Sequence, residues 1–226
     1  MELSSEDAAK RSVGYAAVDR FVRDGACLGL GTGTTAYWAV QRLGEVVAKG
    51  WTLRAVATSV ATERQCRDLG IPLIALGDEP LDVAIDGADE AAPDRSLIKG
   101  GGGALFREKA VALAARTFVA IVTERKLVQQ LGAFPLPVEV VPFSARYVAG
   151  EIEALGARVT VRSHGATAFV SDNGNTILDC AFRAIPQPAE LDAQLRGLHG
   201  VVATGLFVGI ASHVLVGNAD GSISGL

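Results

Sequence analysis

Cysteine is scarce in this chain of 226 residues. Its three cysteines, Cys27, Cys66 and Cys180, lie far apart along the sequence and are odd in number. Their spacing matches neither a zinc site nor the disulfide framework of a small secreted protein. The sequence therefore predicts buried free thiols in a protein of a reducing compartment.

Histidine is as scarce as cysteine, and the residues His164, His199 and His213 lack the spacing of metal ligands. No serine stands in the Gly-x-Ser-x-Gly pattern of a nucleophile elbow. These absences argue against a zinc enzyme and against a hydrolase that depends on histidine. We expect no metal site.

The chain also lacks a strong charge and a long apolar run. Its 21 Lys and Arg residues are opposed by 25 Asp and Glu residues, for a net charge of −4. Such a balance gives no basic surface for nucleic acid or anionic membranes. No uncharged apolar run reaches the roughly 18 residues of a membrane span, and the N-terminus lacks the apolar core of a signal peptide. We expect a cytoplasmic protein that binds neither nucleic acid nor membranes.

What the chain does contain is an ordinary globular composition, with 49% hydrophobic and 20% charged residues. Over its first half, apolar runs alternate with helical patterns. Helices are predicted at 8–22, 36–48, 60–69 and 104–115, strands at 26–30 and 53–58, and further apolar runs lie at 71–76, 83–85 and 118–122. This alternation is typical of an α/β fold with an open, mainly parallel sheet covered on both faces. Ligands of such sheets bind at the carboxyl ends of the strands.

The pattern changes after residue 131. Strands are predicted at 138–141 and 157–161, a hairpin over 169–178, a strand from residue 201, and helices at 145–155 and 189–195. The hairpin should turn at Asp172-Asn173-Gly174-Asn175, because an Asn-Gly pair tolerates positive φ. This β-α-β-β-α-β order matches a ferredoxin-like unit inserted into the main fold. The last apolar runs, 207–210 and 214–216, should return to the main sheet.

A glycine- and threonine-rich loop follows the first strand, as Gly31-Thr32-Gly33-Thr34-Thr35. Backbone N–H groups and hydroxyls at the start of a helix suit a compact phosphate monoester. The glycines also fit a dinucleotide fingerprint, but no acidic residue ends the second strand to hold a ribose. Phosphate binding is the favoured interpretation, and a dinucleotide site or a turn without ligand are the alternatives.

Carboxylates cluster after the apolar run 83–85, where Asp86, Asp89 and Glu90 lie within five residues. Their mutual repulsion is costly unless a ligand, a cation or hydrogen-bond donors neutralise it. A Mg²⁺ site and a solvated acidic turn are alternatives. Lys99 follows ten residues after Asp89 and offers a countercharge, so no metal is required.

Four consecutive glycines, Gly100 to Gly103, separate Lys99 from Glu108 near the start of a predicted helix. Glycine lets the backbone crowd a ligand and adopt positive φ. A partly buried Glu108 would have a raised pKa, which suits a general base. The alternative is a solvated helix face at Arg107-Glu108-Lys109.

These segments, in this order, resemble the type A ribose-5-phosphate isomerase family. The matching blocks are GLGTGTT (29–35), TSVATERQCRDLGIPL (58–73), VAIDGADE (83–90), IKGGGGALFREK (98–109), LGAFPLPVEVV (131–141), DNGNTILD (172–179) and GVVATGLFVG (200–209). The resemblance implies a Rossmann-like main domain (1–130 plus 205–226) and a ferredoxin-like subdomain (131–204). It also implies reversible isomerisation of D-ribose 5-phosphate and D-ribulose 5-phosphate in the non-oxidative pentose phosphate pathway, without cofactor or metal, in a homodimer or homotetramer.

The resemblance further implies roles for individual residues. Glu108 matches the base that moves a proton between C2 and C1. Asp86, Asp89 and Lys99 match residues that contact the sugar, aid ring opening and stabilise the oxyanion. The remaining residues that match substrate contacts are Thr32, Gly33, Thr34, Thr35, Gly87, Ala88, Gly100, Gly101, Gly102 and Lys126, with Lys10 as a further cation near the phosphate.

Three positions depart from the family's usual pattern: Val60, Thr123 and Arg125. The last two precede Lys126 and leave its local role open. Two other functions are compatible with the same segments, namely a non-catalytic sugar-phosphate sensor and an acyl-group transferase that uses Glu108 as nucleophile. A sensor has no need of a base, so the presence of Glu108 beside the carboxylates favours catalysis.

Overall fold

The computed structural model describes residues 3–226 and is built around a six-stranded sheet of order β15-β14-β6-β3-β1-β2. The strands are β1 (Cys27–Leu30), β2 (Arg54–Ala57), β3 (Leu81–Gly87), β6 (Ala115–Thr123), β14 (His213–Gly217) and β15 (Ile223–Gly225). All neighbours pair in parallel except β14 and β15, which are antiparallel. The predicted mainly parallel α/β sheet is confirmed, while β15 was not predicted.

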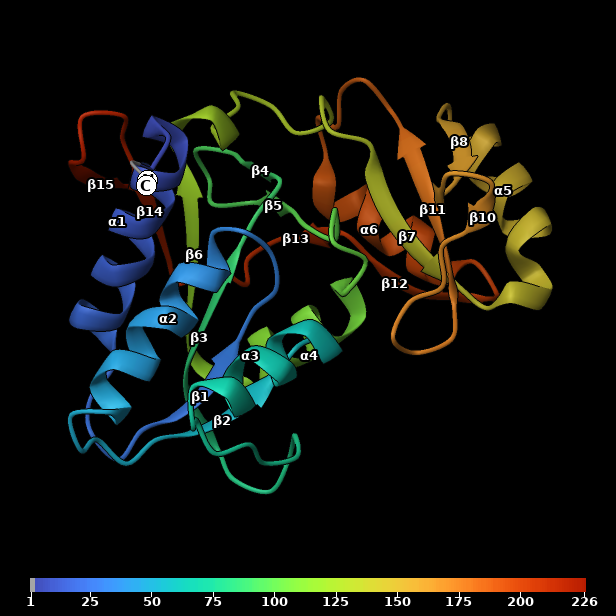
Figure 1. Cartoon of the computed structure of the whole chain (residues 1–226). Helices are drawn as coiled ribbons and strands as arrows, with labels where there is room; N and C mark the ends of the chain where they lie inside the picture. Colours follow the sequence, from blue (N-terminus) through green and yellow to red (C-terminus); the bar gives the residue numbers. More distant parts are fainter. Residues whose placement is uncertain (1–2) are drawn as a thin grey trace.

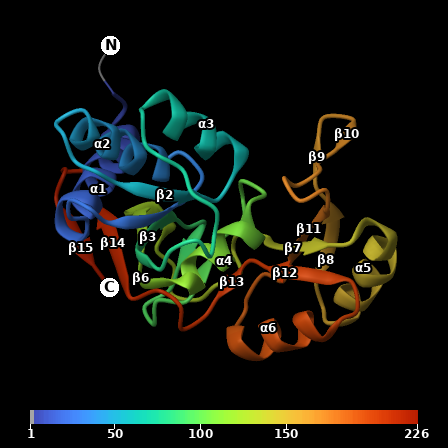
Figure 2. The same cartoon turned by 90° about the horizontal axis from the view of Figure 1, so that it is seen from below.

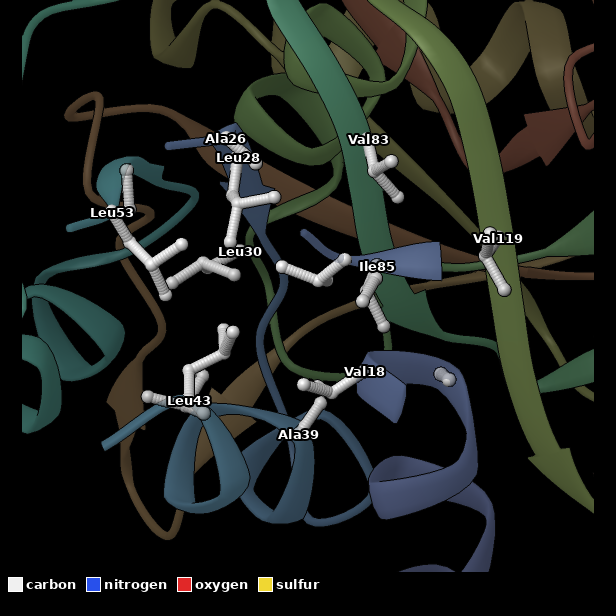
Figure 3. Packing of buried hydrophobic residues seen from close by; sticks show 14 of the residues in the cluster. Val18, Ala26, Leu28, Leu30, Ala39, Leu43, Leu53, Val83, Ile85 and Val119 are labelled. Carbon is white, nitrogen blue, oxygen red and sulfur yellow. The ribbon is translucent and has the colours of Figure 1, made fainter. Parts of the chain in front are cut away.

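Helices cover both faces of this sheet. Helices α1 (Ser5–Phe21), α2 (Ala36–Val47) and α3 (Val60–Asp68) pack on one face, and α4 (Leu105–Ala114) packs on the other. Figure 3 shows Leu28, Leu30 and Ile85 of the sheet directed at Val18 of α1 and Leu43 of α2. Strands buried on both faces tend to be apolar throughout, which explains why β1 and the middle of β3, Val83 to Ile85, form continuous apolar runs.

The second unit is a four-stranded antiparallel sheet of order β12-β7-β11-β8. Its elements in chain order are β7 (Leu136–Val140), α5 (Ala145–Ala154), β8 (Arg158–Val161), β11 (Thr176–Ala181), α6 (Pro188–Gly197) and β12 (Val201–Thr204). It lies to the right of the main sheet in Figure 1, and it has its own buried core. The predicted ferredoxin-like order is present, while the boundaries 1–130 plus 205–226 and 131–204 stay a prediction.

The connection between β8 and β11 differs from the predicted hairpin. Residues Asp172 to Asn175 do form a turn, with Gly174 at φ +81°, but Val170 and Thr176 make only a single bridge across it. The chain before the turn instead forms a small hairpin of β9 (Ser163–His164) and β10 (Thr167–Ala168), which projects from the unit in Figure 2. Strand β11 is therefore free to pair with β7 and β8.

One other predicted strand pairing is wrong. Residues 207–210 do not return to the main sheet; β13 (Leu206–Phe207) pairs with β5 (Leu97–Ile98), which pairs with β4 (Glu90–Ala91) in a separate three-stranded sheet. The run 71–76 forms only one bridge, between Ala55 and Leu73. Pro72 has no N–H to donate to a ladder, and the chain turns at Ala75, whose amide binds Asp78.

The three cysteines, Cys27, Cys66 and Cys180, are buried free thiols, as predicted. Burial raises the pKa of Cys66 to about 11 and that of Cys180 to about 12, so both thiols remain protonated at neutral pH. No helix within residues 3–226 is long and apolar enough to cross a membrane.

Candidate active site

A buried cluster of three charged side chains lies where β3, β5 and α4 meet. The Lys99 ammonium is 2.8 Å from Asp86 Oδ2 and 3.2 Å from Glu108 Oε2, and it donates a hydrogen bond to the Gly87 carbonyl at 2.5 Å. The side chains of Lys99, Asp86 and Glu108 are 2%, 5% and 3% exposed. One cation thus faces two carboxylates away from bulk water.

Each member of the cluster is held by its local structure. Asp86 lies near the carboxyl end of β3, and its Oδ1 accepts hydrogen bonds from the amides of Thr32 (3.0 Å) and Gly87 (2.7 Å). A Cβ on Gly31 would lie 2.0 Å from that same oxygen, so only glycine fits there. Glu108 occupies the first turn of α4. The helix N-terminus favours its negative charge, in opposition to burial.

Burial gives Glu108 an unusually high pKa in spite of the shared cation. Burial and then the nearby Asp86 charge raise the pKa of Glu108 to about 8, against the opposing effect of Lys99. Burial also raises the pKa of Asp86, again opposed by Lys99. Burial alone would lower the pKa of Lys99, but the Asp86 and Glu108 charges raise it above its ordinary value. Lys99 therefore stays charged while a carboxylate near it can carry a proton at neutral pH.

The glycine run encloses the cluster. Gly100 has φ +101° and Gly103 has φ +80°, conformations that other residues rarely adopt. The Gly101 amide donates to Asp89 Oδ2 at 2.7 Å, and a Cβ on Gly101 would lie 2.6 Å from Asp89 Oδ1. The predicted close approach of backbone to this site is present.

The threonine loop is arranged differently from the prediction. Gly33 has φ +109°, and the loop leads into α2, as expected for a helix N-terminus. The Thr32 hydroxyl, however, is hydrogen-bonded to Thr58 (2.8 Å) and Ser59 (2.8 Å). This hydroxyl cluster anchors the loop to the N-terminus of α3, so Thr32 lines the site without offering a free hydroxyl. No local pattern in the sequence signals that pairing, because it joins two loops.

A cavity of about 270 Å³ opens above the cluster. It is lined by Glu108 and by every residue that the resemblance matched to substrate contacts except Asp86, which lies beneath it against Lys99. Lys10 of α1 and Lys126, which ends a short 3-10 helix (Glu124–Lys126), supply cations to the lining.

The lining also includes Thr123, which the sequence marked only as a departure from the family pattern, and one residue that sequence reasoning missed altogether, Glu6 of α1. Its carboxylate accepts a hydrogen bond from Thr123 (3.1 Å) and lies 3.5 Å from Arg125 and 3.8 Å from Lys10. Thr123 and Arg125, the two departures from the family pattern beside Lys126, therefore both contact Glu6. Glu6 is more than a hundred residues away in sequence, so only the fold could have revealed it.

The arrangement joins a glycine- and threonine-rich loop at a helix N-terminus and two lysines to a buried acid–base cluster. A carboxylate with a pKa of about 8 can exchange a proton near neutral pH. A fixed ammonium beside it can stabilise negative charge that develops on oxygen. Fold and site together define an α/β protein equipped for proton transfer on a small phosphorylated molecule.

Comparisons with known proteins identify the family within this class. The family model described as ribose 5-phosphate isomerase A (phosphoriboisomerase A) matches residues 54–221. Ribose-5-phosphate isomerase A 1 of Oceanobacillus iheyensis is 45% identical over 220 residues, which cover 96% of this chain and 98% of that protein. The chain belongs to the ribose 5-phosphate isomerase A family.

Solved structures agree with this assignment. The ribose 5-phosphate isomerase A of Methanocaldococcus jannaschii superposes with a TM-score of 0.93 at 37% identity, covering 99% of both chains. A D-ribose-5-phosphate isomerase in complex with phospho-erythronic acid gives a TM-score of 0.94 at 33% identity, covering 100% of this chain and 99% of that one. The Rossmann-like fold is confirmed, and the sensor alternative finds no support among relatives named as isomerases.

Proposed function

We propose that this protein interconverts D-ribose 5-phosphate and D-ribulose 5-phosphate by proton transfer through an enediolate. The observation that carries the proposal is the cluster of Lys99, Asp86 and Glu108, buried at the base of a cavity whose rim holds a phosphate-type loop. The membership of the chain in the isomerase family supports the same reaction.

Glu108 is the proposed base. In the open-chain sugar it takes the proton from C2, and negative charge develops on O1 as the enediolate forms. Returning that proton to C1, while the proton on O2 passes to O1, completes the ketose. Such a positioned base contributes roughly 10²–10⁴-fold to rate.

Lys99 is the proposed stabiliser of the developing oxyanion, because its charge is fixed by Asp86 and by the Gly87 carbonyl. A preorganised donor of this kind is worth on the order of 10²–10³-fold. Asp89 and Asp86 are proposed to assist ring opening. The loop residues Gly33 to Thr35, together with Lys10 and Lys126, are proposed to hold the phosphate at the other end of the cavity.

We further propose that the reaction needs no cofactor, and that the protein is a cytoplasmic homodimer or homotetramer. The three buried free thiols support a reducing compartment such as the cytoplasm. The absence of a cofactor and the oligomeric state follow from the family resemblance.

The test is conversion of ribose 5-phosphate by the purified protein in EDTA, with incorporation of solvent deuterium at C1 and C2 followed by NMR. Wild-type protein should turn over, with kcat/KM rising as the pH passes through about 8, where Glu108 loses its proton. Glu108→Gln should lose roughly 10²–10⁴-fold of kcat and all deuterium exchange. The matched control is Glu151→Gln, at an exposed position of α5.

Two outcomes would contradict the proposal. Binding of ribose 5-phosphate without turnover by wild-type protein would identify a sensor. Turnover that survives Glu108→Gln would transfer the base role to Asp86 or Asp89.

A further inference from the structure

The segment Asp172–Asp179 matches a family block, yet none of its residues lines the cavity. Its last residue, Asp179 on β11, contacts the glycine run through one intermediary, Arg162. We propose that Arg162, held by Asp179, is a positioning residue that turns the Gly102 amide into the cavity as an oxyanion donor. This inference rests on the proposed isomerase function.

The Arg162 guanidinium is fixed on two sides. Toward the second unit it forms a two-pronged ion pair with Asp179, with Nε 3.0 Å from Oδ2 and its second nitrogen donating to Oδ1 at 2.5 Å. Toward the main unit, its remaining nitrogen donates to the carbonyls of Gly100 (2.7 Å) and Gly101 (3.1 Å). The Arg162 side chain is 11% exposed, and the Phe169 ring lies 5.8 Å from the guanidinium carbon. The guanidinium therefore has one position and holds two consecutive peptides.

Those two hydrogen bonds determine where the amides of the same peptides point. In a planar trans peptide the N–H lies opposite the C=O. Because the Gly100 carbonyl faces Arg162, the Gly101 amide points away from it, and it donates to Asp89. Because the Gly101 carbonyl also faces Arg162, the Gly102 amide must point away from it as well.

The Gly102 amide is the one left for a ligand. Within residues 3–226 it donates to no protein acceptor, whereas the neighbouring Gly101 and Gly103 amides donate to Asp89 and to the Gly100 carbonyl. Gly102 is exposed and lines the cavity, while Arg162 does not line it. The Gly102 N–H thus has no protein acceptor, and the largely buried Arg162 fixes the orientation of its peptide through the Gly101 carbonyl. Such an N–H is a preorganised donor.

The chemistry of the reaction gives this donor a use. The enediolate carries negative charge on sugar oxygens, and Lys99 alone is shared between Asp86 and Glu108. A backbone N–H adds stabilisation without adding a second titrating group. The hydrogen bond from this N–H is strongest in the transition state, because the charge on oxygen is greatest there. Its loss should therefore lower kcat more than it raises KM.

The test compares Arg162→Met and Asp179→Asn with Arg158→Met, an exposed position at the start of β8, the strand that Arg162 follows. Both positioning variants should lower kcat by roughly 10- to 100-fold, less than the roughly 10²–10³-fold of a donor that is removed outright, because the Gly102 amide is misdirected and not deleted. KM should change less than about threefold. Affinity for phospho-erythronic acid, whose carboxylate resembles the enediolate, should fall in parallel with kcat/KM. Arg158→Met should match the wild type in all three quantities.

Two further measurements separate positioning from folding. Methylguanidinium added to Arg162→Ala should restore part of kcat, which a variant that is merely misfolded would not show. A crystal structure of Arg162→Met should show the Gly100 and Gly101 peptides rotated. If these peptides keep their orientation, or if kcat is unchanged while wild type is active, the inference is wrong although the isomerase function stands. Absence of activity in the wild type would instead refute the proposed function.

Discussion

Two buried carboxylates in this chain have opposite surroundings. Glu108 lies at 4% exposure beside a lysine that it shares with Asp86, and it lines the cavity. Glu139, at 0% exposure in β7, has no cation in the described ion pairs and does not line the cavity. Its Oε1 instead accepts three hydrogen bonds, from Ser171 (2.8 Å), Asn173 (3.1 Å) and Asn175 (2.9 Å).

The difference shows how one residue type serves two purposes. Neutral donors that converge on Glu139 fix the turn 171–175, whose Asp172 in turn accepts the amide of Val60 at the start of α3. Glu139 thus ties the second unit to the main one. Glu108 lines the cavity and lies near a second carboxylate, that of Asp86. Burial together with the Asp86 charge raises the pKa of Glu108 to about 8. Hydrogen bonds from neutral donors give Glu139 a structural role. Burial beside Asp86 instead raises the pKa of Glu108 and suits it to proton transfer.

The largest effect should come from removing the shared cation. Lys99→Met leaves Asp86 and Glu108 buried without a partner, and breaking a buried pair in this way typically costs about 3–5 kcal/mol. The free energy of unfolding in urea at pH 8 measures the loss. The double variant Lys99→Met/Glu108→Gln should recover part of it, because only one carboxylate is then left uncompensated. If Glu108→Gln changed the stability by the same amount in the wild type and in Lys99→Met, the two side chains would not interact.

A smaller effect is expected at the structural carboxylate. Glu139→Gln keeps an acceptor oxygen but loses the negative charge, and hydrogen bonds to charged groups exceed neutral ones by about 1 kcal/mol. We expect a loss of about 1–2 kcal/mol in the free energy of unfolding and a kcat within a factor of about three of wild type. A loss of kcat comparable to that of Glu108→Gln, at unchanged stability, would contradict the division of roles.

Local signals in the sequence were sufficient for much of the fold. Helix α2 was predicted at 36–48 and is found at Ala36–Val47, because its apolar stripe and the preceding glycine loop are adjacent in sequence. Strand β13 was assigned to the wrong sheet, since its pairing with β5 depends on a contact more than a hundred residues away. Apolarity identifies a strand but does not choose its partner.

The same limit applies to the site. The cavity brings together residues that lie in glycine- and carboxylate-rich loops, where local chemistry is unusual enough to be noticed. Glu6 and Arg162 gave no such signal, because an ordinary Glu on a helix and an ordinary Arg after a strand become special only through distant partners. The hydrogen bonds of the Thr32 hydroxyl gave no signal for the same reason, as its partners Thr58 and Ser59 follow another strand.

The smallest effect should be the pH dependence of stability that Glu108 produces. The folded-state pKa of Glu108, about 8, exceeds the ordinary value of 4.5 expected in the unfolded chain. Between these values the folded state binds more protons than the unfolded state, so the free energy of unfolding falls as pH rises, by at most about 1.4 kcal/mol per pH unit. Lys99 remains protonated throughout this range and does not contribute, whereas Asp86, whose pKa burial also raises, adds a slope of the same sign. Urea unfolding from pH 5.5 to 8.5 should therefore show a decline in the free energy of unfolding that is shallower in Glu108→Gln than in the wild type. An identical slope in wild type and Glu108→Gln would mean that Glu108 is ionised in the folded protein at all these pH values, and that its proton exchange is not tuned by burial.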